Sequence, residues 1–290
     1  MTLDPDIARD ISYASSARSR SGRALIRLLE NVTGRLSLMR RAAGYQSEVA
    51  QGRDFWSVIV ERYGLSLDVT AGSLAAIPRN GPLIVIANHP FGILDGLMMG
   101  HILSASRGDF RILAHQVFRR AEDLNRVILP VSFDETKPAV QQNIETRKVA
   151  LDFLSQGGAI GIFPGGTVST APKPFGRPSD PVWRNFTAKM VARSGATVVP
   201  IWFDGANSRM FQVASHLHSN LRMALLIMEF HARVDEPVRV AIGAPIPPEM
   251  FVHHRQDAKA MMDFLRARTY ALSGTSGAPL GFEFEGKYRV

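Results

Sequence analysis

The feature that most constrains the fold is a set of short, uninterrupted apolar runs, each followed by a turn and a helical stretch. The clearest is LIVIA at residues 83–87. Similar runs occupy residues 110–115, 159–163 and 198–203. A strand that is apolar at every position is typical of sheets with both faces covered. Helical stretches are expected at 95–106, 138–156 and 181–194. The pattern predicts an α/β fold with a mixed, largely parallel sheet flanked by helices.

Two further strands and one helix are expected in the last quarter of the chain. The strands are predicted at 223–231 and 237–242, and the helix near 255–272. Strand ends that meet at one edge of such a sheet are where functional loops gather. We therefore expect catalytic or binding residues directly after the apolar runs.

The N-terminal region is helical and precedes the first apolar run. Residues 1–20 are polar and rich in Ser and Arg, and we expect them to be mobile. Helical periodicity follows over residues 22–45 and again over about 47–64. No Pro/Gly linker separates this region from the rest. We expect a helical segment, 1–65, packed on a main domain, 66–290.

Charge and cysteine content restrict the partners and the chemistry. The formal net charge of +8 favours an anionic partner, such as nucleic acid, a membrane surface or a phosphorylated substrate. No nucleic-acid-binding motif is present, so nucleic acid is not expected. The absence of cysteine excludes disulfides, thiolate metal ligands and cysteine nucleophiles. The N-terminus lacks the apolar core of a signal peptide, and no apolar stretch of about 18 residues predicts a transmembrane helix.

The strongest candidate site follows the first apolar run. Asn88 and His89 come directly after the strand, and a Pro/Gly turn leads to Asp95 at the expected start of a helix. A neutral imidazole is a suitable base near neutral pH, and an aspartate on its other ring nitrogen fixes the tautomer. The base would activate a hydroxyl of the substrate, so no enzyme nucleophile is needed. The same spacing also fits a structural histidine with Asp95 as a helix cap.

A second candidate follows the run at 159–163. The residues are Phe163, Pro164, Gly165, Gly166, Thr167, Val168 and Ser169. Glycines let backbone amides approach an anion, and hydroxyls add donors. In isolation the segment fits a plain turn better than an anion-binding loop. A third segment, Val199-Pro200-Ile201, reads alone as a core strand.

Taken in order, the three segments resemble the glycerolipid (lysophospholipid) acyltransferase superfamily, the His-x-Asp acyltransferases. That family's pattern is Asn-His, four residues and Asp, then Phe-Pro-Glu-Gly-Thr-Arg-Ser, then Val-Pro-Val. The resemblance covers about residues 80–245. The Asn-His-Pro-Phe-Gly sequence is similar to the hemolysin-like branch and its bacterial lyso-ornithine-lipid and aminolipid O-acyltransferases.

This resemblance implies a reaction and a set of site residues. Acyl-ACP or acyl-CoA would be the co-substrate, with no cofactor and no metal, and a lyso-lipid hydroxyl the acceptor. His89 and Asp95 would be catalytic. The expected substrate-binding residues are Asn88, Phe91, Gly92, Phe163, Pro164, Gly165, Gly166, Thr167 and Arg184. Amides of the Gly92 or Gly165–Gly166 turns are expected to stabilise the oxyanion. The resemblance also implies a peripheral membrane protein at the cytoplasmic face of the cell membrane.

Three departures from the family pattern bear on the acceptor. Five residues, not four, separate His89 from Asp95, so the turn must bulge for the two to meet. Gly165 and Val168 replace a glutamate and an arginine that help to hold glycerol phosphate in the family. We therefore expect a lyso-aminolipid acceptor. Alternatives are lysophosphatidic acid, with a basic residue elsewhere replacing the contact, and a non-catalytic lipid-binding protein of the same fold. The basic candidates are Arg126, Lys173, Arg177 and Arg184.

The stretch at 22–45 combines apolar spacing with arginines, as expected of a helix that lies in a lipid headgroup layer. The apolar positions are Leu25, Leu28, Leu29, Val32, Leu36 and Met39. A core helix with a solvated arginine face is the alternative. The pairs His216/His218 and His253/His254 lack the sequence context of a metal site and are expected to be ordinary surface or core residues.

Overall fold

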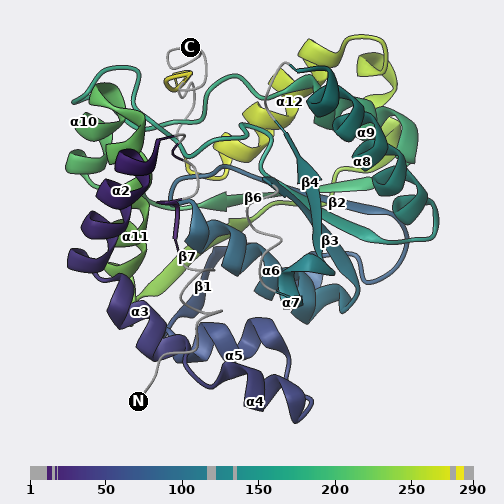
Figure 1. Ribbon diagram of the computed structural model, residues 1–290. Coiled ribbons are helices and arrows are strands. Elements are labelled where there is room, and N and C mark those ends of the chain that lie inside the picture. Colours follow the sequence, from purple (N-terminus) through teal and green to yellow (C-terminus); the bar gives the residue numbers. More distant parts are fainter. Residues whose placement is uncertain are drawn as a thin grey trace.

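The computed structural model describes residues 12–14, 17, 19–115, 122–132, 136–274 and 279–283. Its centre is a seven-stranded sheet with strand order β1-β7-β6-β2-β5-β3-β4 (Figure 1). The strands are β1 (Ser66–Ala71), β2 (Leu83–Ala87), β3 (Phe110–His115), β4 (Ile128–Val131), β5 (Ala159–Ile162), β6 (Thr197–Phe203) and β7 (Pro237–Ile242). Neighbouring strands are parallel except β6 and β7, which are antiparallel. The prediction of a mixed, largely parallel sheet is confirmed.

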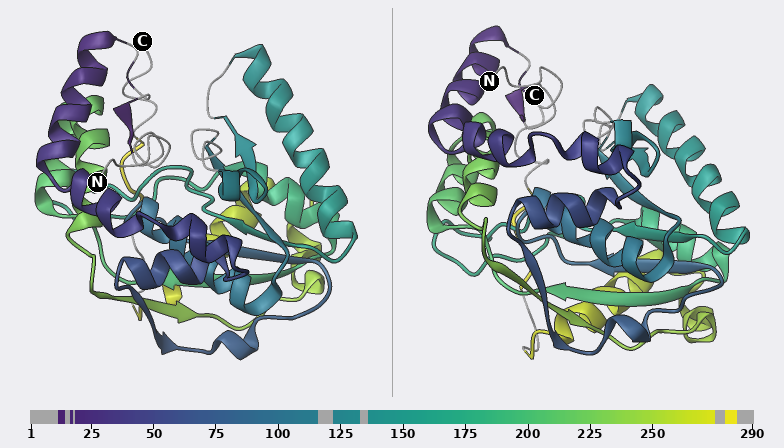
Figure 2. Two further views of the ribbon diagram at one scale, coloured as in Figure 1. Left: turned by 60° about the horizontal axis from the view of Figure 1, so that its bottom comes forward. Right: turned by 90° about the horizontal axis from the view of Figure 1, so that it is seen from below.

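Helices cover both faces of the sheet, as β2 shows. Leu83, Val85 and Ala87 belong to one hydrophobic core, whereas Ile84 and Ile86 belong to the other. The first core includes residues of α2 (Arg20–Val32), α3 (Arg35–Ala42), α5 (Phe55–Arg62), α6 (Ile93–Arg107) and α11 (Ser219–His231). The second includes residues of α8 (Lys137–Ser155), α9 (Asn185–Ser194) and α12 (Ala258–Ala271). Figure 2 shows α2 and α8 at opposite sides of the molecule.

Several shorter helices complete the described chain. They are α4 (Tyr45–Ala50), α7 (Glu122–Asn125), α10 (Arg209–Leu217) and the 3-10 helices η2 (Leu74–Ala76) and η4 (Pro248–His254). None of the helices among the described residues is both long and apolar enough to cross a membrane.

The N-terminal region consists of α2 to α5 instead of two continuous helices. The break between α2 and α3 lies at Gly34, whose φ of 121° is rarely adopted by residues with a side chain. A Cβ there would lie 2.4 Å from the ring of His231, so glycine is also needed for close approach. Helix α2 packs on α11, and α5 packs on α6. The first strand begins at Ser66, next to the predicted boundary, while the division into 1–65 and 66–290 remains a prediction.

The first residues of the chain are partly held in place. The buried carboxylate of Glu30 accepts hydrogen bonds from Ser12 Oγ and from the Tyr13 amide, each at 2.6 Å. Tyr13 is buried in the core. The expectation that residues 1–20 are mobile is therefore wrong for Ser12 and Tyr13. Residues 1–11, 15, 16 and 18 lie outside the described residues.

The predicted strand at 223–231 is wrong, because these residues belong to helix α11. The side chain of His218 caps the helix by accepting a hydrogen bond from the Asn220 amide at 3.0 Å. The buried positions include Arg222, Leu226 and Phe230, which recur every four residues, the spacing of one helix face. A short apolar run such as MALLIM does not distinguish a buried helix from a buried strand by periodicity alone.

Candidate active site

The loop that carries His89 is anchored where β2 ends. Both ends of the Asn88 side-chain amide bond to the backbone of Phe203: Nδ2 donates to its oxygen at 2.9 Å, and Oδ1 accepts from its nitrogen at 2.7 Å. Asn88, predicted to bind substrate, thus joins the ends of β2 and β6. Because Asn88 is buried with both groups bonded, the residue after it leaves the sheet in a fixed direction.

His89 and Asp95 meet despite the extra residue between them. His89 Nδ1 lies 2.9 Å from Asp95 Oδ2. The same oxygen accepts hydrogen bonds from the amides of Phe91 at 2.8 Å and Gly92 at 2.9 Å. Asp95 is the third residue of α6, where a carboxylate reaching back to free amides caps the helix. Gly92 has a φ of 90°, a conformation that favours glycine, so the turn bulges at the residue best able to do so.

The geometry fixes which nitrogen of His89 can act on a substrate. With Nδ1 donating to the carboxylate, the neutral ring has Nε2 as its acceptor. The ring stacks on Phe163, with centroids 4.3 Å apart and an interplanar angle of 24°. The side chain keeps 18% of its surface exposed, while Asp95 is fully buried. An imidazole whose Nδ1 is bonded to a carboxylate and whose ring is partly open to solvent can serve as a general base through Nε2.

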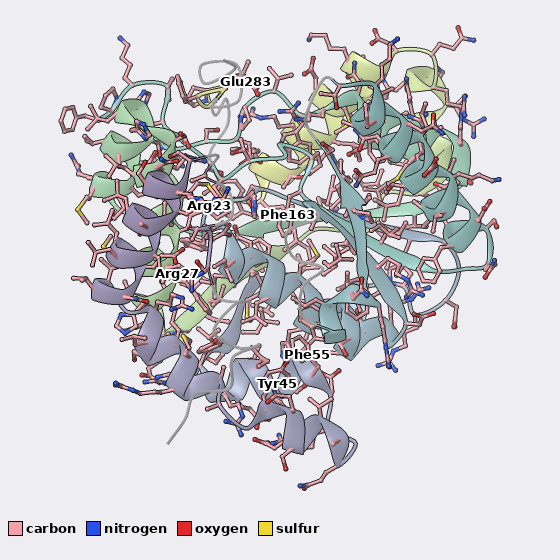
Figure 3. All side chains as sticks on the ribbon, viewed as in Figure 1. Arg23, Arg27, Tyr45, Phe55, Phe163 and Glu283 are labelled. Atoms are coloured by element: carbon pink, nitrogen blue, oxygen red, sulfur yellow. The ribbon has the colours of Figure 1, made fainter. Side chains whose placement is uncertain are left out.

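The second predicted segment forms a tight turn beside His89. The amide of Gly166 donates to the oxygen of Phe163 at 3.0 Å and closes the turn, with Gly166 at a φ of 71°. The amide of Arg184 donates to the oxygen of Pro164 at 2.9 Å, which places Arg184 next to this turn. Its guanidinium also forms an ion pair with Glu283 at 3.2 Å. Figure 3 shows Phe163 near the middle of the molecule and Glu283 at its margin.

Two of the amides expected to stabilise an oxyanion are already engaged. The Gly92 amide donates to Asp95, and the Gly166 amide closes the turn. The amide of Gly165, at the third position of that turn, takes no part in the closing bond. Gly165 is therefore the remaining candidate among the three glycines.

Arg222, which the sequence did not suggest, lies behind the second segment. It is buried, and its guanidinium donates to Thr167 Oγ1 at 3.2 Å and to the oxygen of Val168 at 2.8 Å. It also donates to Thr170 Oγ1 at 2.6 Å and to Ser215 Oγ at 2.7 Å. Arg222 thus brings a positive charge to the position where the family pattern has an arginine at 168. Arg126, Lys173 and Arg177, considered for that role, are exposed. The only hint in the sequence is a lone arginine at the start of an apolar run.

Val168 and Phe91 pack inward instead of facing the open side of His89. A Cβ at Gly92 would lie 3.2 Å from Val168 Cγ2, so Val168 fills the space beneath the turn. Phe91 is buried, and the guanidinium of Arg233 lies 3.9 Å from its ring centroid. Burial lowers the pKa of Arg233. Both side chains support the loop that carries the His89–Asp95 dyad.

His216 and His254, one from each histidine pair noted in the sequence, contact other protein groups. Among the residues that the structure describes, no group of three or more His, Cys, Asp or Glu side chains could hold a metal ion. His216 Nε2 lies 2.9 Å from the oxygen of Ala171, and its ring packs on Phe282. His254 stacks on Phe264.

The fold, the dyad and the turn beside it define a class of protein, and comparison with known families agrees. The family model described as acyltransferase matches residues 47–278. Since this is most of the chain, the chain belongs to the acyltransferase family and is an acyltransferase. The predicted membership of the glycerolipid acyltransferase superfamily is confirmed.

Two relatives and one solved structure are similar to this chain. A lyso-glycine lipid O-acyltransferase of Phocaeicola vulgatus is 26% identical over 69% of this chain and 71% of its own length. A protein of the same name from Bacteroides thetaiotaomicron is 24% identical over 71% of this chain and 75% of its own. The crystal structure of the 1-acyl-sn-glycerophosphate acyltransferase PlsC from Thermotoga maritima aligns with a TM-score of 0.48 and 15% identity, covering 88% of this chain and 98% of that one.

Proposed function

We propose that the protein is an O-acyltransferase that moves a fatty acyl group from acyl-ACP or acyl-CoA to the hydroxyl of a lyso-lipid, one of the lyso-aminolipid type. The observation that carries the proposal is the 2.9 Å contact between His89 Nδ1 and Asp95 Oδ2, with Nε2 left for the substrate. A dyad of this kind, without an enzyme nucleophile, suits direct attack by the acceptor.

The proposed transfer is direct, from donor to acceptor through a tetrahedral intermediate, without an acyl-enzyme. His89 Nε2 takes the proton of the acceptor hydroxyl as its oxygen forms a bond to the thioester carbonyl carbon. The negative charge moves to the carbonyl oxygen, for which the Gly165 amide is the candidate donor. The carbon–sulfur bond then breaks, and the proton on His89 passes to the departing thiolate. Asp95 stabilises the imidazolium between these two events. The reaction needs no cofactor besides the donor thioester.

Two observations favour an aminolipid acceptor over a simple phosphate. Both curated relatives are named for a lyso-glycine lipid. In addition, this chain has Gly165 and Val168 where the family pattern has two polar residues. Arg222 does bring a charge close to Val168, but it is buried and bonded to hydroxyl and carbonyl oxygens of the protein. It therefore supports the segment and is poorly placed to bind a phosphate.

The protein would take its acceptor from the cytoplasmic face of the cell membrane as a peripheral protein. Support comes from the outer side of α2 and α3, which carries Leu25, Leu28, Val32 and Leu36, all exposed. The buried positions of α2 are Gly22, Ile26 and Glu30, so several of its leucines and its valine face away from the core. Arg23 and Arg27 lie on the same helix (Figure 3). Such a surface suits an anionic lipid interface.

An acceptor panel tests the proposal. The purified chain is supplied with one acyl-ACP and, separately, one acyl-CoA, and with lyso-glycine lipid, lyso-ornithine lipid or lysophosphatidic acid. We expect a diacylated product from a lyso-aminolipid, detected by mass spectrometry. Transfer to lysophosphatidic acid alone would contradict the acceptor class. Binding of lyso-lipids without transfer would instead indicate a non-catalytic protein.

A further inference from the structure

A second buried carboxylate, Asp180, lies against the loop that carries His89. Asp180 is fully buried and precedes α9. Its Oδ1 accepts hydrogen bonds from the amide of His89 at 3.2 Å and from the hydroxyl of Ser169. Its Oδ2 accepts from Trp183 Nε1 at 2.9 Å. Because each carboxylate oxygen has at least one donor, this carboxylate has a defined orientation.

The contacts of Asp180 close a triangle around the main chain of His89. The amide of His89 bonds to Asp180, and its carbonyl oxygen accepts from the amide of Ser169 at 2.7 Å. The hydroxyl of Ser169 then returns to the same oxygen of Asp180. Asp95 and Phe163 restrain the ring of His89, whereas Asp180 and Ser169 restrain its backbone. Both sets of contacts are needed to fix where Nε2 lies.

Asp180 also fills the space next to Gly165. A Cβ added at Gly165 would lie 3.3 Å from Asp180 Cγ and 3.4 Å from its Oδ2. Gly165 is not among the glycines with positive φ, so its backbone would accept a side chain. The nearest obstacle to a side chain there is the side chain of Asp180. A glutamate at position 165 would extend into the volume that the Asp180 carboxylate occupies.

We propose that Asp180 is a positioning residue for His89, and that its carboxylate occupies space that a side chain at position 165 would otherwise enter. The inference rests on the proposed role of His89 as the base. Since Asp180 is buried, it acts through the backbone of His89 and does not touch the substrate.

The test first removes the carboxylate of Asp180 and then places a new carboxylate in the same space from position 165. Asp180→Leu keeps the branched shape of the side chain, with two methyl groups in place of the two oxygens, and removes the hydrogen-bond acceptors. We expect kcat to fall roughly ten- to a hundredfold with KM for the lyso-lipid unchanged, the effect of a displaced catalytic group. In Gly165→Glu/Asp180→Ala, the glutamate reaches the vacated space, and kcat should recover at least in part. Asp152→Leu is the matched control, because it makes the same substitution at an exposed carboxylate of α8. Its kcat should stay near that of the parent.

A second readout does not depend on turnover. The proton on His89 Nδ1, shared with Asp95, is followed by nitrogen-15 NMR and assigned by its loss in His89→Ala. We expect this signal to broaden or disappear in Asp180→Leu, to persist in Asp152→Leu and to return in the double variant. If Asp180→Leu does not fold, Asp180→Ala replaces it as the reference for the double variant in both measurements.

The outcomes separate this inference from the proposed function. A folded Asp180→Leu with unchanged kcat and an unchanged Nδ1 proton signal would overturn the role of Asp180 and leave the acyltransfer proposal standing. A folded double variant that is inactive and lacks the signal would also count against it. If the parent protein acylates no lyso-lipid, the proposed function fails, while the NMR comparison still tests Asp180.

Discussion

One carboxylate oxygen of Asp95 both caps helix α6 and accepts the hydrogen bond from the ring of His89. This oxygen, Oδ2, receives three N–H donors, from the ring of His89 and from the amides of Phe91 and Gly92. The two amides are the free donors at the start of α6, so the cap that begins the helix also fixes the partner of the base. The dyad therefore depends on the local folding of the helix terminus.

This arrangement predicts the outcome of Asp95→Asn. The two amides select an oxygen at the Oδ2 position, so the asparagine keeps the cap and still accepts from His89 Nδ1. What is lost is the negative charge that stabilises the imidazolium. We expect kcat to fall roughly a hundredfold or more, with little change in melting temperature. Steady-state kinetics and thermal unfolding measure the two effects.

Asp54→Asn is the control for that variant. Asp54 caps α5 by accepting from the Ser57 amide at 2.8 Å, and asparagine is an equally good cap. Its activity should equal that of the parent. Full activity in Asp95→Asn would show that the charge of the partner carboxylate is not used.

Arg222 leads to a prediction about stability. Replacing it by methionine removes the hydrogen bonds that Arg222 donates to the oxygens of Thr167, Val168, Thr170 and Ser215. We expect Arg222→Met to lower the free energy of unfolding by about 3–5 kcal/mol, as measured by denaturant titration. The exposed Arg209→Met should change it little. Equal stability of both variants would contradict the role given to Arg222.

The His89–Asp95 pair was predictable because both residues share one loop. His89 and Asp95 are six positions apart, and the chemistry of their pairing can be read from a short segment. Arg222 and Asp180 are 55 and 91 positions from the groups they hold, Thr167 and His89. No local pattern records such contacts, because they exist only once the sheet and its helices have assembled.

At the scale of elements, strands buried on both faces were predictable and edge strands were not. The uniformly apolar β2 lies inside the sheet, between β6 and β5. The unpredicted β1 and β4 are the two edge strands. Strand β1 is largely exposed, and β4 contains Pro130, which an edge strand tolerates because one side of its backbone needs no ladder bond. Strand β1 thus lacks the continuous apolar pattern, whereas β4 is apolar but has only four residues, one of them proline.

The exposed stripe on α2 gives a prediction at this scale. Leu28 and Val32 are 61% and 77% exposed, so replacing both by aspartate should leave the fold intact. We expect Leu28→Asp/Val32→Asp to reduce binding to vesicles that contain phosphatidylglycerol, because it removes apolar area and adds negative charge. Co-sedimentation measures the bound fraction.

Met250→Asp/Val252→Asp is the matched control for the α2 variant. These two residues lie in η4 and are exposed to a similar degree, 52% and 51%. This control should bind vesicles like the parent. Equal loss in both double variants would contradict a specific docking role for α2.

For the whole molecule, the sheet gathers the site from segments far apart in the chain. The parallel strands β2 and β5 pair directly, so the loops that follow them carry His89 and Phe163 to the same edge. The antiparallel β6–β7 pair and α11 then bring in residues from the last third of the chain. This is the arrangement expected where loops leave the carboxyl ends of parallel strands.

The central claim is that His89 is the base for acyl transfer to a lyso-lipid. The most direct measurement is the rate at which His89→Ala forms diacylated product from acyl donor and a lyso-aminolipid, compared with the parent and with the exposed-histidine control His253→Ala. The account predicts transfer by the parent and the control, and none above background by a folded His89→Ala of unchanged melting temperature. Transfer at the parental rate by His89→Ala would contradict it.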